Sequence, residues 1–331
     1  MELPQPFIRL PWTFDAARMA QEVAALPEEA WMAHPSRLRG NSAVALVSRG
    51  GGDNDDFDGP MAPTPHLREC PAILQAMASL GEVLGRSRLM RLAPGAEVAL
   101  HVDFNYHWVS RVRIHVPIVT DPRVLFQCAD QQVHMAAGEC WTFNSWRRHR
   151  VVNGSDRARV HLVMDTAGSA RFWRTVETAL RGEAGEPRSV AFDPDAEPAL
   201  ETERFNTAPV MAPGELDRLV GELIGEFERH PGNDPGTVRA YRRLLLDFAR
   251  DWRAAWHRHG YDRTGWPAYR VLIERVRKGL HPQPRALVTA SNQVGVNPII
   301  VQRILAPALS EERFDDVIAK AAGAADATRA S

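Results

Sequence analysis

The segment HVDFNYHW, residues 101–108, contains a histidine and an aspartate two positions apart. It lies in a stretch whose pattern predicts a strand, and alternate side chains of a strand point to the same face. His101 and Asp103 are therefore expected to lie side by side. Such a pair is either part of a metal site or a structural hydrogen-bonded pair, and a third ligand is needed to separate these interpretations.

The third ligand must be a histidine that the fold brings close. The strand-rich region offers five candidates, which are His107, His115, His134, His149 and His161. His149 is preferred because it lies at the start of a predicted strand–turn–strand hairpin, RHRVVNGSDRARVHLVMD. Two histidines and a carboxylate occupy one face of an octahedron and leave three positions open, which suits non-haem Fe(II) and O2 chemistry. A structural zinc site would instead close its shell with four ligands.

Arg159 begins the last predicted strand, ten residues after His149. Oxygenases that activate O2 at iron usually need an electron-donating co-substrate, and 2-oxoglutarate chelates Fe(II) through its keto acid. The distal carboxylate of 2-oxoglutarate suits the planar fork of an arginine, and Arg159 is placed for that role. Taken alone, an exposed strand arginine in a salt bridge is the alternative interpretation.

Short β-branched and aromatic segments fill residues 86–166, separated by turn signals such as APGAE and NGSD. About eight strands at this spacing predict a sandwich, jelly roll or barrel, and the motifs favour a jelly roll. Before this region, residues 13–27 and 71–84 have helical spacing, and 42–48 has the pattern of a strand. The Gly/Asp/Pro-rich stretch 49–65 is expected to be a long loop. Its acidic part is expected to be solvated, with a lid over the site as the alternative.

Helical periodicity returns after the strands, first at residues 171–181 and then from about 209 onward. The Pro/Glu/Asp-rich stretch 182–206 between them predicts a mobile, poorly packed linker. Pro213 is expected to start a helix, and Gly260 and Gly279 are expected to end helices.

These patterns predict an α+β protein with a double-stranded β-helix (jelly roll) core and a carboxy-terminal all-α domain. The predicted boundaries are 1–168 for the jelly-roll domain with its amino-terminal helices, 169–208 for a helix and linker, and 209–331 for the helical domain. The apolar stripes of the last region are compatible with covering the active site, with recognising a peptide and with forming a homodimer.

The charges are balanced, with 40 basic and 41 acidic residues and a formal net charge of −1. This balance gives no electrostatic reason to expect nucleic acid or an anionic membrane as a partner. No run approaches the roughly 18 apolar residues of a membrane span, and the amino terminus lacks a secretory pattern. The three cysteines form no CxxC pair. A cytoplasmic protein with free thiols is expected.

Two longer stretches, HVDFNYHWVSRVRIHVPIVT and GECWTFNSWRRHRVVNGSDRARVHLVMDT, resemble the aspartyl/asparaginyl β-hydroxylase family of Fe(II)/2-oxoglutarate oxygenases. The resemblance covers residues 30–168 and is greatest to the bacterial L-proline cis-4-hydroxylase-like branch. It implies Fe(II), 2-oxoglutarate and O2 as cofactor and co-substrates. It also implies that His101, Asp103 and His149 are the iron ligands and that Arg159 binds the distal carboxylate.

The resemblance further implies that Arg113 and His115 lie near the co-substrate. The animal members that hydroxylate protein domains lack the carboxylate of the triad, whereas Asp103 is present here. This difference points to an amino acid or a peptide as the substrate. Candidate substrate-binding residues are Arg91, for a carboxylate, together with Asn105 and Trp108. Ordinary packing or surface exposure is the alternative for all three residues.

We therefore expect a dioxygenase that hydroxylates an unactivated C–H of an amino acid or a peptidyl residue and releases succinate and CO2. A non-catalytic, cupin-like sensor module that binds the metal and 2-oxoglutarate without turnover is the alternative from another class. A metalloenzyme that needs no 2-oxoglutarate is a further alternative, which the placement of Arg159 disfavours.

Overall fold

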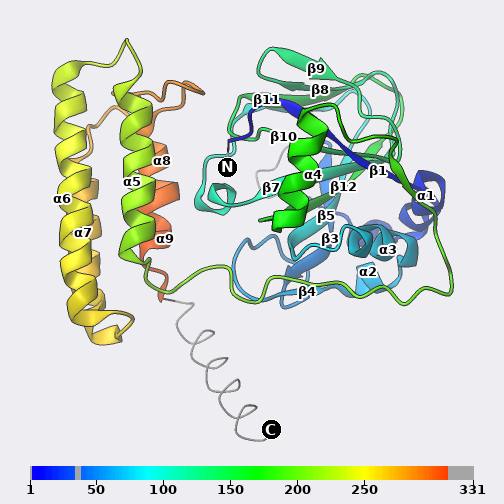
Figure 1. Cartoon of the computed structure of the whole chain (residues 1–331), viewed down its shortest axis with the longest axis horizontal. Helices are drawn as coiled ribbons and strands as arrows, with labels where there is room; N and C mark the ends of the chain where they lie inside the picture. The colour runs from blue at the N-terminus through cyan, green and yellow to red at the C-terminus, as the bar shows by residue number, and fades with distance from the viewer. Residues whose placement is uncertain (1, 34–38, 312–331) are drawn as a thin grey trace, which may run out of the picture. The chain divides into compact units, whose positions relative to one another are not determined.

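The computed structural model describes residues 2–33 and 39–311. The chain divides into two compact units (Figure 1). The first unit contains Met1–Asp103 and Ser110–Asn206, and the second contains Phe104–Val109 and Thr207–Ser331. The described helices all lack the combination of length and apolarity that a bilayer crossing requires.

The first unit is built on a nine-stranded sheet in the order β13–β1–β10–β7–β12–β5–β3–β2, with β4 beside β3. Its central strands pair antiparallel, and β13 joins β1 in parallel. In chain order the strands are β1 (Phe7–Phe14), β2 (Met32–Ala33), β3 (Asn41–Arg49), β4 (Met61–Pro63), β5 (Leu84–Leu92), β7 (Val112–Val119), β10 (Glu139–Phe143), β12 (Arg159–Thr166) and β13 (Arg188–Val190).

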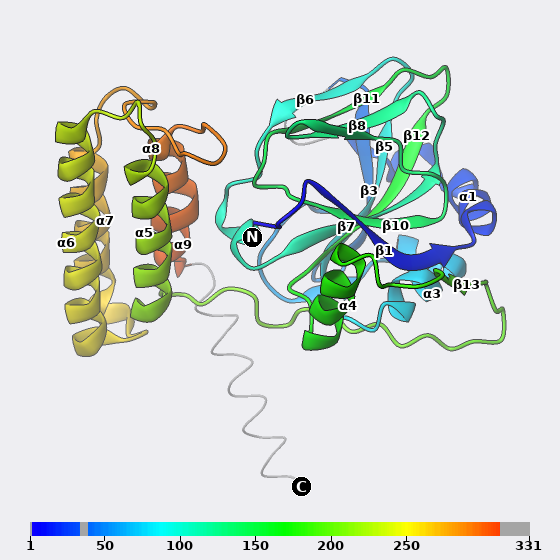
Figure 2. The same ribbon diagram turned by 45° about the horizontal axis from the view of Figure 1, so that its top comes forward.

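Four further strands form a smaller antiparallel sheet in the order β6–β11–β8–β9. They are β6 (Glu97–His101), β8 (Val124–Cys128), β9 (Gln131–Val133) and β11 (His149–Asn153). Aromatic rings join the two sheets, since Phe126 of β8 lies 5.5 Å from Phe7 and 4.7 Å from Phe143, measured between ring centroids. Two antiparallel sheets around a common core form the predicted jelly roll (Figure 2).

Helices pack on the outer face of the larger sheet. Even-numbered residues of β7 and β12, such as Ile114 and Leu162, belong to the core that these helices share with the sheet. The helices of this unit are α1 (Ala16–Ala25), the 3₁₀ turn η1 (Glu28–Ala30), α2 (Pro65–Arg68), α3 (Pro71–Ser79) and α4 (Ala170–Leu180). Because strand side chains alternate, the odd-numbered residues of β7 and β12 face the smaller sheet.

Residues 182–206 are mostly exposed, as predicted for a poorly packed segment, but two parts of the segment are bonded to the rest of the first unit, which the prediction of a linker did not foresee. Strand β13 lies in this segment and extends the sheet beyond β1. Farther along, the Leu84 amide donates to the Glu201 carbonyl and the Glu203 amide donates to the Leu84 carbonyl, both at 2.9 Å. Main-chain hydrogen bonds hold the segment in place, and its polar composition gives no sign of them.

The second unit is helical. Its elements are the 3₁₀ turn η2 (Tyr106–Val109), α5 (Pro213–Glu228), α6 (Pro235–His259), the 3₁₀ turn η3 (Arg263–Gly265), α7 (Trp266–Gly279), α8 (Val296–Ile299), the π-helical turn η4 (Ile300–Leu305) and α9 (Ala306–Ala308). As predicted, Pro213 begins a helix, Gly260 follows the last residue of α6 with φ 52°, and Gly279 ends α7. The helix predicted near the carboxy terminus, over 311–322, lies outside the described residues apart from its first residue.

The segment Phe104–Val109 belongs to the helical unit although it lies in the middle of the jelly-roll sequence. Its turn η2 contacts η4, and the Tyr106 hydroxyl donates to a carboxylate oxygen of Glu215. Trp108 and Val109 are buried. The chain therefore leaves the jelly roll directly after Asp103 and returns to it at Ser110.

Candidate active site

His101 and His149 lie side by side on two neighbouring strands of the smaller sheet. His101 is the last residue of β6, His149 is the first residue of β11, and the two are register partners in the antiparallel pair. Directly opposite residues point to the same face, so the two rings lie with their centroids 4.1 Å apart. Asp103 follows β6 and is held by its amide, which donates to the Ser145 carbonyl at 3.0 Å.

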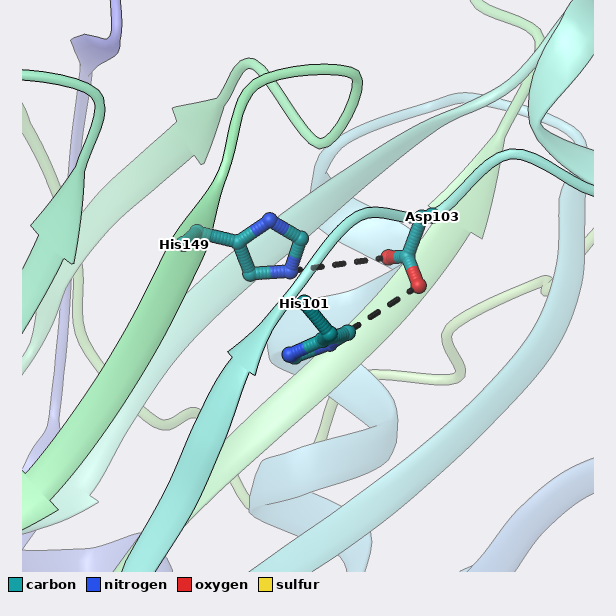
Figure 3. A group of neighbouring side chains, drawn as sticks. All are labelled: His101, Asp103 and His149. Carbon is teal, nitrogen blue, oxygen red and sulfur yellow. Dashed lines mark ion pairs between the residues drawn. The ribbon is translucent and has the colours of Figure 1, made fainter. Parts of the chain in front are cut away.

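The three side chains converge on one point (Figure 3). One donor atom from each residue lies within 4.8 Å of the other two. Nε2 of His101 is 3.9 Å from Oδ1 of Asp103, and Nε2 of His149 is 3.9 Å from Oδ2. No second cluster of this kind occurs in the described parts of the chain.

Main-chain carbonyls fix which nitrogen of each histidine is free to bind a metal. Nδ1 of His101 is 2.8 Å from the Ala99 carbonyl, and Nδ1 of His149 is 2.9 Å from the Arg147 carbonyl. A carbonyl only accepts, so each Nδ1 carries the proton and each Nε2 keeps its lone pair. This arrangement is the usual outer-shell support of a metal-binding histidine.

The protonation states also suit a metal. Burial lowers the pKa of His149 to about 4, so its imidazole is neutral at physiological pH. Oδ2 of Asp103 is buried and accepts no hydrogen bond from any described residue. Its one described cationic side-chain neighbour besides the histidines, Nη1 of Arg113, is 3.8 Å away, so this oxygen remains able to bind a metal ion. Two imidazoles and a carboxylate fit Fe(II) with open coordination positions.

Arg159 is a buried charge without a counter-ion. Only 5% of the residue is exposed, and no described carboxylate forms an ion pair with it. Burial lowers the pKa of Arg159 to about 9, which still leaves the guanidinium charged at neutral pH. Its Nε has no hydrogen-bond partner among the described residues. A buried, unpaired guanidinium is costly, and an anionic ligand would compensate its charge.

Two histidines lie between Arg159 and the triad. Nη2 of Arg159 donates to Nδ1 of His161 at 2.8 Å, and that Nδ1 is 3.4 Å from Nδ1 of His115. Burial holds the pKa of both histidines well below the usual value, so both are neutral. The ring of His115 in turn lies 5.4 Å from that of Phe143, which is 4.8 Å from His149.

His161 was predicted only as one of five candidates for the third metal ligand. The structure places it beside Arg159 rather than in the triad. The available signal was its position two residues after Arg159 on one strand, which puts both side chains on the same face.

Arg113, predicted to lie near the co-substrate, has its own carboxylate partners. Its Nε is 3.1 Å from Oδ1 of Asp165, and its Nη1 is 3.8 Å from Oδ2 of Asp103. Asp165 is 1% exposed. Arg113 therefore joins the carboxylate of Asp103 to a second, buried carboxylate on β12.

The predicted substrate-binding residues lie elsewhere. Arg91 pairs with Glu28, donates to Ser42 and stacks on Trp31, on the face of β5 opposite to that of Arg88. The structure does not bring Arg91 together with the triad.

Asn105 and Trp108 belong to the segment grouped with the helical unit. Trp108 is 3% exposed and packs edge-on against His107, and Oδ1 of Asn105 is buried without a hydrogen-bond partner among the described residues. Nothing within either unit assigns these two side chains to the triad.

A jelly roll that carries two histidines and an aspartate at one strand end has the set of ligands that non-haem Fe(II) oxygenases use. Residues 20–168 match the sequence profile of the aspartyl/asparaginyl β-hydroxylase family. The match covers less than half of the chain, most of it in the jelly-roll unit, and it supports an Fe(II)- and 2-oxoglutarate-dependent oxygenase of the hydroxylase type. Among curated proteins, no sequence matches the chain.

Solved structures with a similar fold include an oxidoreductase of the 2OG-Fe(II) oxygenase family from Burkholderia pseudomallei. It has 16% identity and a TM-score of 0.38, with 49% of this chain and 85% of that chain covered. A Pseudomonas putida prolyl-4-hydroxylase has 15% identity and a TM-score of 0.35, with coverage of 49% and 92%. A prolyl hydroxylase from Trichoplax adhaerens has 13% identity and a TM-score of 0.36, with coverage of 49% and 84%. At these scores the likeness carries no argument about substrate.

Proposed function

We propose that this enzyme hydroxylates an unactivated C–H of an amino acid or a peptidyl residue and converts 2-oxoglutarate to succinate and CO2. The observation that carries the proposal is the buried, unpaired charge of Arg159. It is connected to the triad through His161, His115 and Phe143. A dicarboxylate that binds a metal at one end and an arginine at the other fits this arrangement of groups.

The residues have separate roles in this proposal. His101, Asp103 and His149 would hold Fe(II), which supplies the oxygen activation when it is bound. Arg159 would bind the distal carboxylate of 2-oxoglutarate through its planar fork. His161 accepts a hydrogen bond from the guanidinium and thereby fixes its orientation.

The rings of Phe126 and Phe143 form an apolar wall against both His149 and His115. An apolar wall of this kind excludes water from the space beside the metal ligands. Low local polarity strengthens the charge interactions of Arg159 and of the triad with their ligands.

The presence of Asp103 supports an amino acid or a peptide as the substrate. The animal members that hydroxylate protein domains lack this carboxylate of the triad. The proline cis-4-hydroxylase branch remains a prediction. The substrate class and the branch are tested by one screen. The protein is incubated with Fe(II), 2-oxoglutarate, O2 and a series of free amino acids and short peptides, and the products are identified by mass spectrometry. The expected product is heavier than its substrate by one oxygen atom and forms together with an equal amount of succinate.

Asp103→Ala is the control for this screen, because it removes one ligand and leaves the rest of the site in place. Binding of 2-oxoglutarate without succinate formation, for every substrate offered, would contradict the proposal and favour a non-catalytic sensor module.

A further inference from the structure

Two buried arginines lie on the inner face of β5. Arg86 and Arg88 are 3% and 5% exposed and are two positions apart, so they share a face of the strand. Burial lowers the pKa of Arg88 to about 9, which leaves its guanidinium charged at neutral pH. Two adjacent buried cations are unfavourable unless an anion lies between them.

That anion is Asp55, which comes from the loop between β3 and β4. One oxygen of its carboxylate, Oδ1, accepts from both arginines, at 2.7 Å from Nη1 of Arg86 and in a short contact with Nη1 of Arg88. Arg86 also donates to the main-chain carbonyl of Asp55 at 3.0 Å. Within the described residues, Asp55 is the one carboxylate that forms an ion pair with Arg88.

The arginine pair is connected to the metal-binding triad by direct contacts. Nε of Arg86 lies 3.8 Å from Oδ2 of Asp165, and it makes no hydrogen bond with any described residue. Asp165 pairs with Arg113, which lies 3.8 Å from the metal-binding carboxylate of Asp103. The carboxylates of Asp103 and Asp165 thus already have partners beside the triad. The carboxylate of Asp55, by contrast, comes from a loop outside the sheet.

The loop that carries Asp55 is held by hydrogen bonds within the β3–β4 connection, such as Gly50 N to the Pro60 carbonyl and Asn54 Nδ2 to the Arg49 carbonyl. It spans residues 50–60, has no regular secondary structure, and contains Gly50, Gly51 and Gly59 at positive φ. Phe57 covers Arg86, whose guanidinium lies 3.8 Å from the ring centroid, and Asn206 bonds to the main chain of Phe57 and Gly59.

The Asp55 side chain remains 29% exposed. A carboxylate at the rim of the site, on a glycine-flanked loop, can be displaced at lower cost than the buried Asp165. The acidic loop is therefore not fully solvated, because the carboxylate of Asp55 forms ion pairs with both arginines.

We propose that Arg86 and Arg88 form the binding site for a carboxylate group of the substrate, and that Asp55 occupies this site as an internal substitute until the substrate displaces it. This inference rests on the proposed function for the identity of the reaction, because it names the substrate chemistry of the same site. It assigns to the substrate a free carboxylate, which approaches Arg88 while the reacting C–H lies toward the triad.

The binding site is tested first without turnover. Asp55→Ala removes the internal carboxylate, and acetate is the probe, with acetamide as its neutral counterpart of similar shape. The melting temperature of Asp55→Ala should fall below that of the parent, and acetate should restore it while acetamide should not. Arg159 is present in all variants, so acetate bound there contributes equally to each.

Two further variants control this measurement. Asp53→Ala lies in the same loop but pairs with His66 at the surface, so it should respond to acetate as the parent does. Adding Arg88→Met to Asp55→Ala should abolish the response. If Asp55→Ala does not fold, Asp55→Asn keeps an acceptor without the charge and serves in its place. Equal responses to acetate and acetamide would overturn the proposed site.

The second test uses turnover. Amino acids with a free carboxylate, their carboxamides, and peptides with free or amidated carboxyl termini are compared as substrates for 2-oxoglutarate-dependent succinate formation. We expect activity only with substrates that have a free carboxylate. Which of these compounds react then shows whether the substrate is a free amino acid or a peptide. Asp55→Asn should lower the KM for the carboxylate substrate about tenfold, the gain expected if Asp55 occupies the site nine-tenths of the time.

The outcomes separate this inference from the proposed function. If carboxamides react as well as acids, the arginine site is wrong while the oxygenase activity stands. If no substrate supports succinate formation, the proposed function fails, and the acetate response still decides whether Arg86 and Arg88 bind an anion.

Discussion

His101 and His149 are register partners on neighbouring antiparallel strands, and this pairing places both imidazoles on the same face with their ring centroids 4.1 Å apart. The strand pairing therefore brings together two of the three proposed metal ligands. Asp103 then approaches both Nε2 atoms at 3.9 Å from the chain that leaves β6. A preformed set of donors binds a metal without first ordering the chain.

Removing the carboxylate of the triad should abolish metal binding but leave the fold intact. Asp103→Ala leaves two imidazoles, and Arg113, which loses a contact of 3.8 Å to Asp103, keeps its closer partner Asp165. We expect the parent, but not the variant, to gain thermal stability when Fe(II) or Mn(II) is added under anaerobic conditions. Asp53→Ala, a surface carboxylate outside the triad, is the matched control. Equal stabilisation of Asp103→Ala and the parent would exclude Asp103 as a ligand.

His161 is expected to act as a positioning residue for 2-oxoglutarate. Its Nδ1 accepts from Arg159, so His161→Phe should release the guanidinium without removing its charge. The KM for 2-oxoglutarate should rise about tenfold, since a hydrogen bond to a charged group contributes roughly 1.5–3 kcal/mol, while kcat changes little. His161→Gln, which keeps an acceptor, should recover part of the loss. A drop in kcat alone would contradict this role.

The buried histidines should make the metal-free protein sensitive to acid. The pKa values of His115 and His161 are lowered in the folded protein, so the unfolded chain binds protons first as the pH falls. Their contribution is complete above the unfolded pKa of about 6.5 and is lost below it, by up to about 1.4 kcal/mol per pH unit for each histidine.

Urea unfolding in the presence of a chelator, from about pH 7.5 to about pH 5.5, measures this dependence. His161→Phe should make the slope shallower by about one proton, whereas the exposed His257→Phe should leave it unchanged. An unchanged slope in His161→Phe would show that His161 takes up its proton in the folded state as well.

The helical unit should be needed for solubility. Its η2 turn is encoded between Asp103 and Ser110, and Trp108 and Val109 are buried in the intact protein. A chain that ends at Asn206 keeps this apolar turn but loses the η4 turn that η2 contacts. We expect the shortened protein to aggregate in size-exclusion chromatography, and substituting Trp108 and Val109 by serine should reduce the aggregation. A soluble, monodisperse fragment without these substitutions would show that the turn needs no helical partner.

The sequence predicted the elements whose side chains alternate clearly. The β-branched alternation of β7 and β12 and the spacing of His101, Asp103 and His149 were sufficient for the jelly roll and for a triad that the fold brings together. The prediction for segment 182–206 missed the attachment of this segment to the jelly roll, because main-chain hydrogen bonds leave no pattern in residue types.

The pairing of Asp55 with Arg86 and Arg88 could not be predicted for a different reason. The partners are about 30 residues apart, and only the folded sheet brings the β3–β4 loop to β5. The sequence also could not show whether Arg91 points toward the site. Strand alternation separates the two faces of β5 but does not say which face lines the site.

The most direct test of the account is an anaerobic calorimetric titration of the Fe(II)-loaded protein with 2-oxoglutarate, comparing the parent with Arg159→Met. We expect one saturable site in the parent and an affinity at least about 30-fold weaker in the variant, because losing a buried partner of a carboxylate costs roughly 2–5 kcal/mol. Arg150→Met, which removes an exposed arginine of β11, should bind as the parent does. Equal affinity of Arg159→Met and the parent would contradict the assignment of Arg159 and, with it, the proposed co-substrate site.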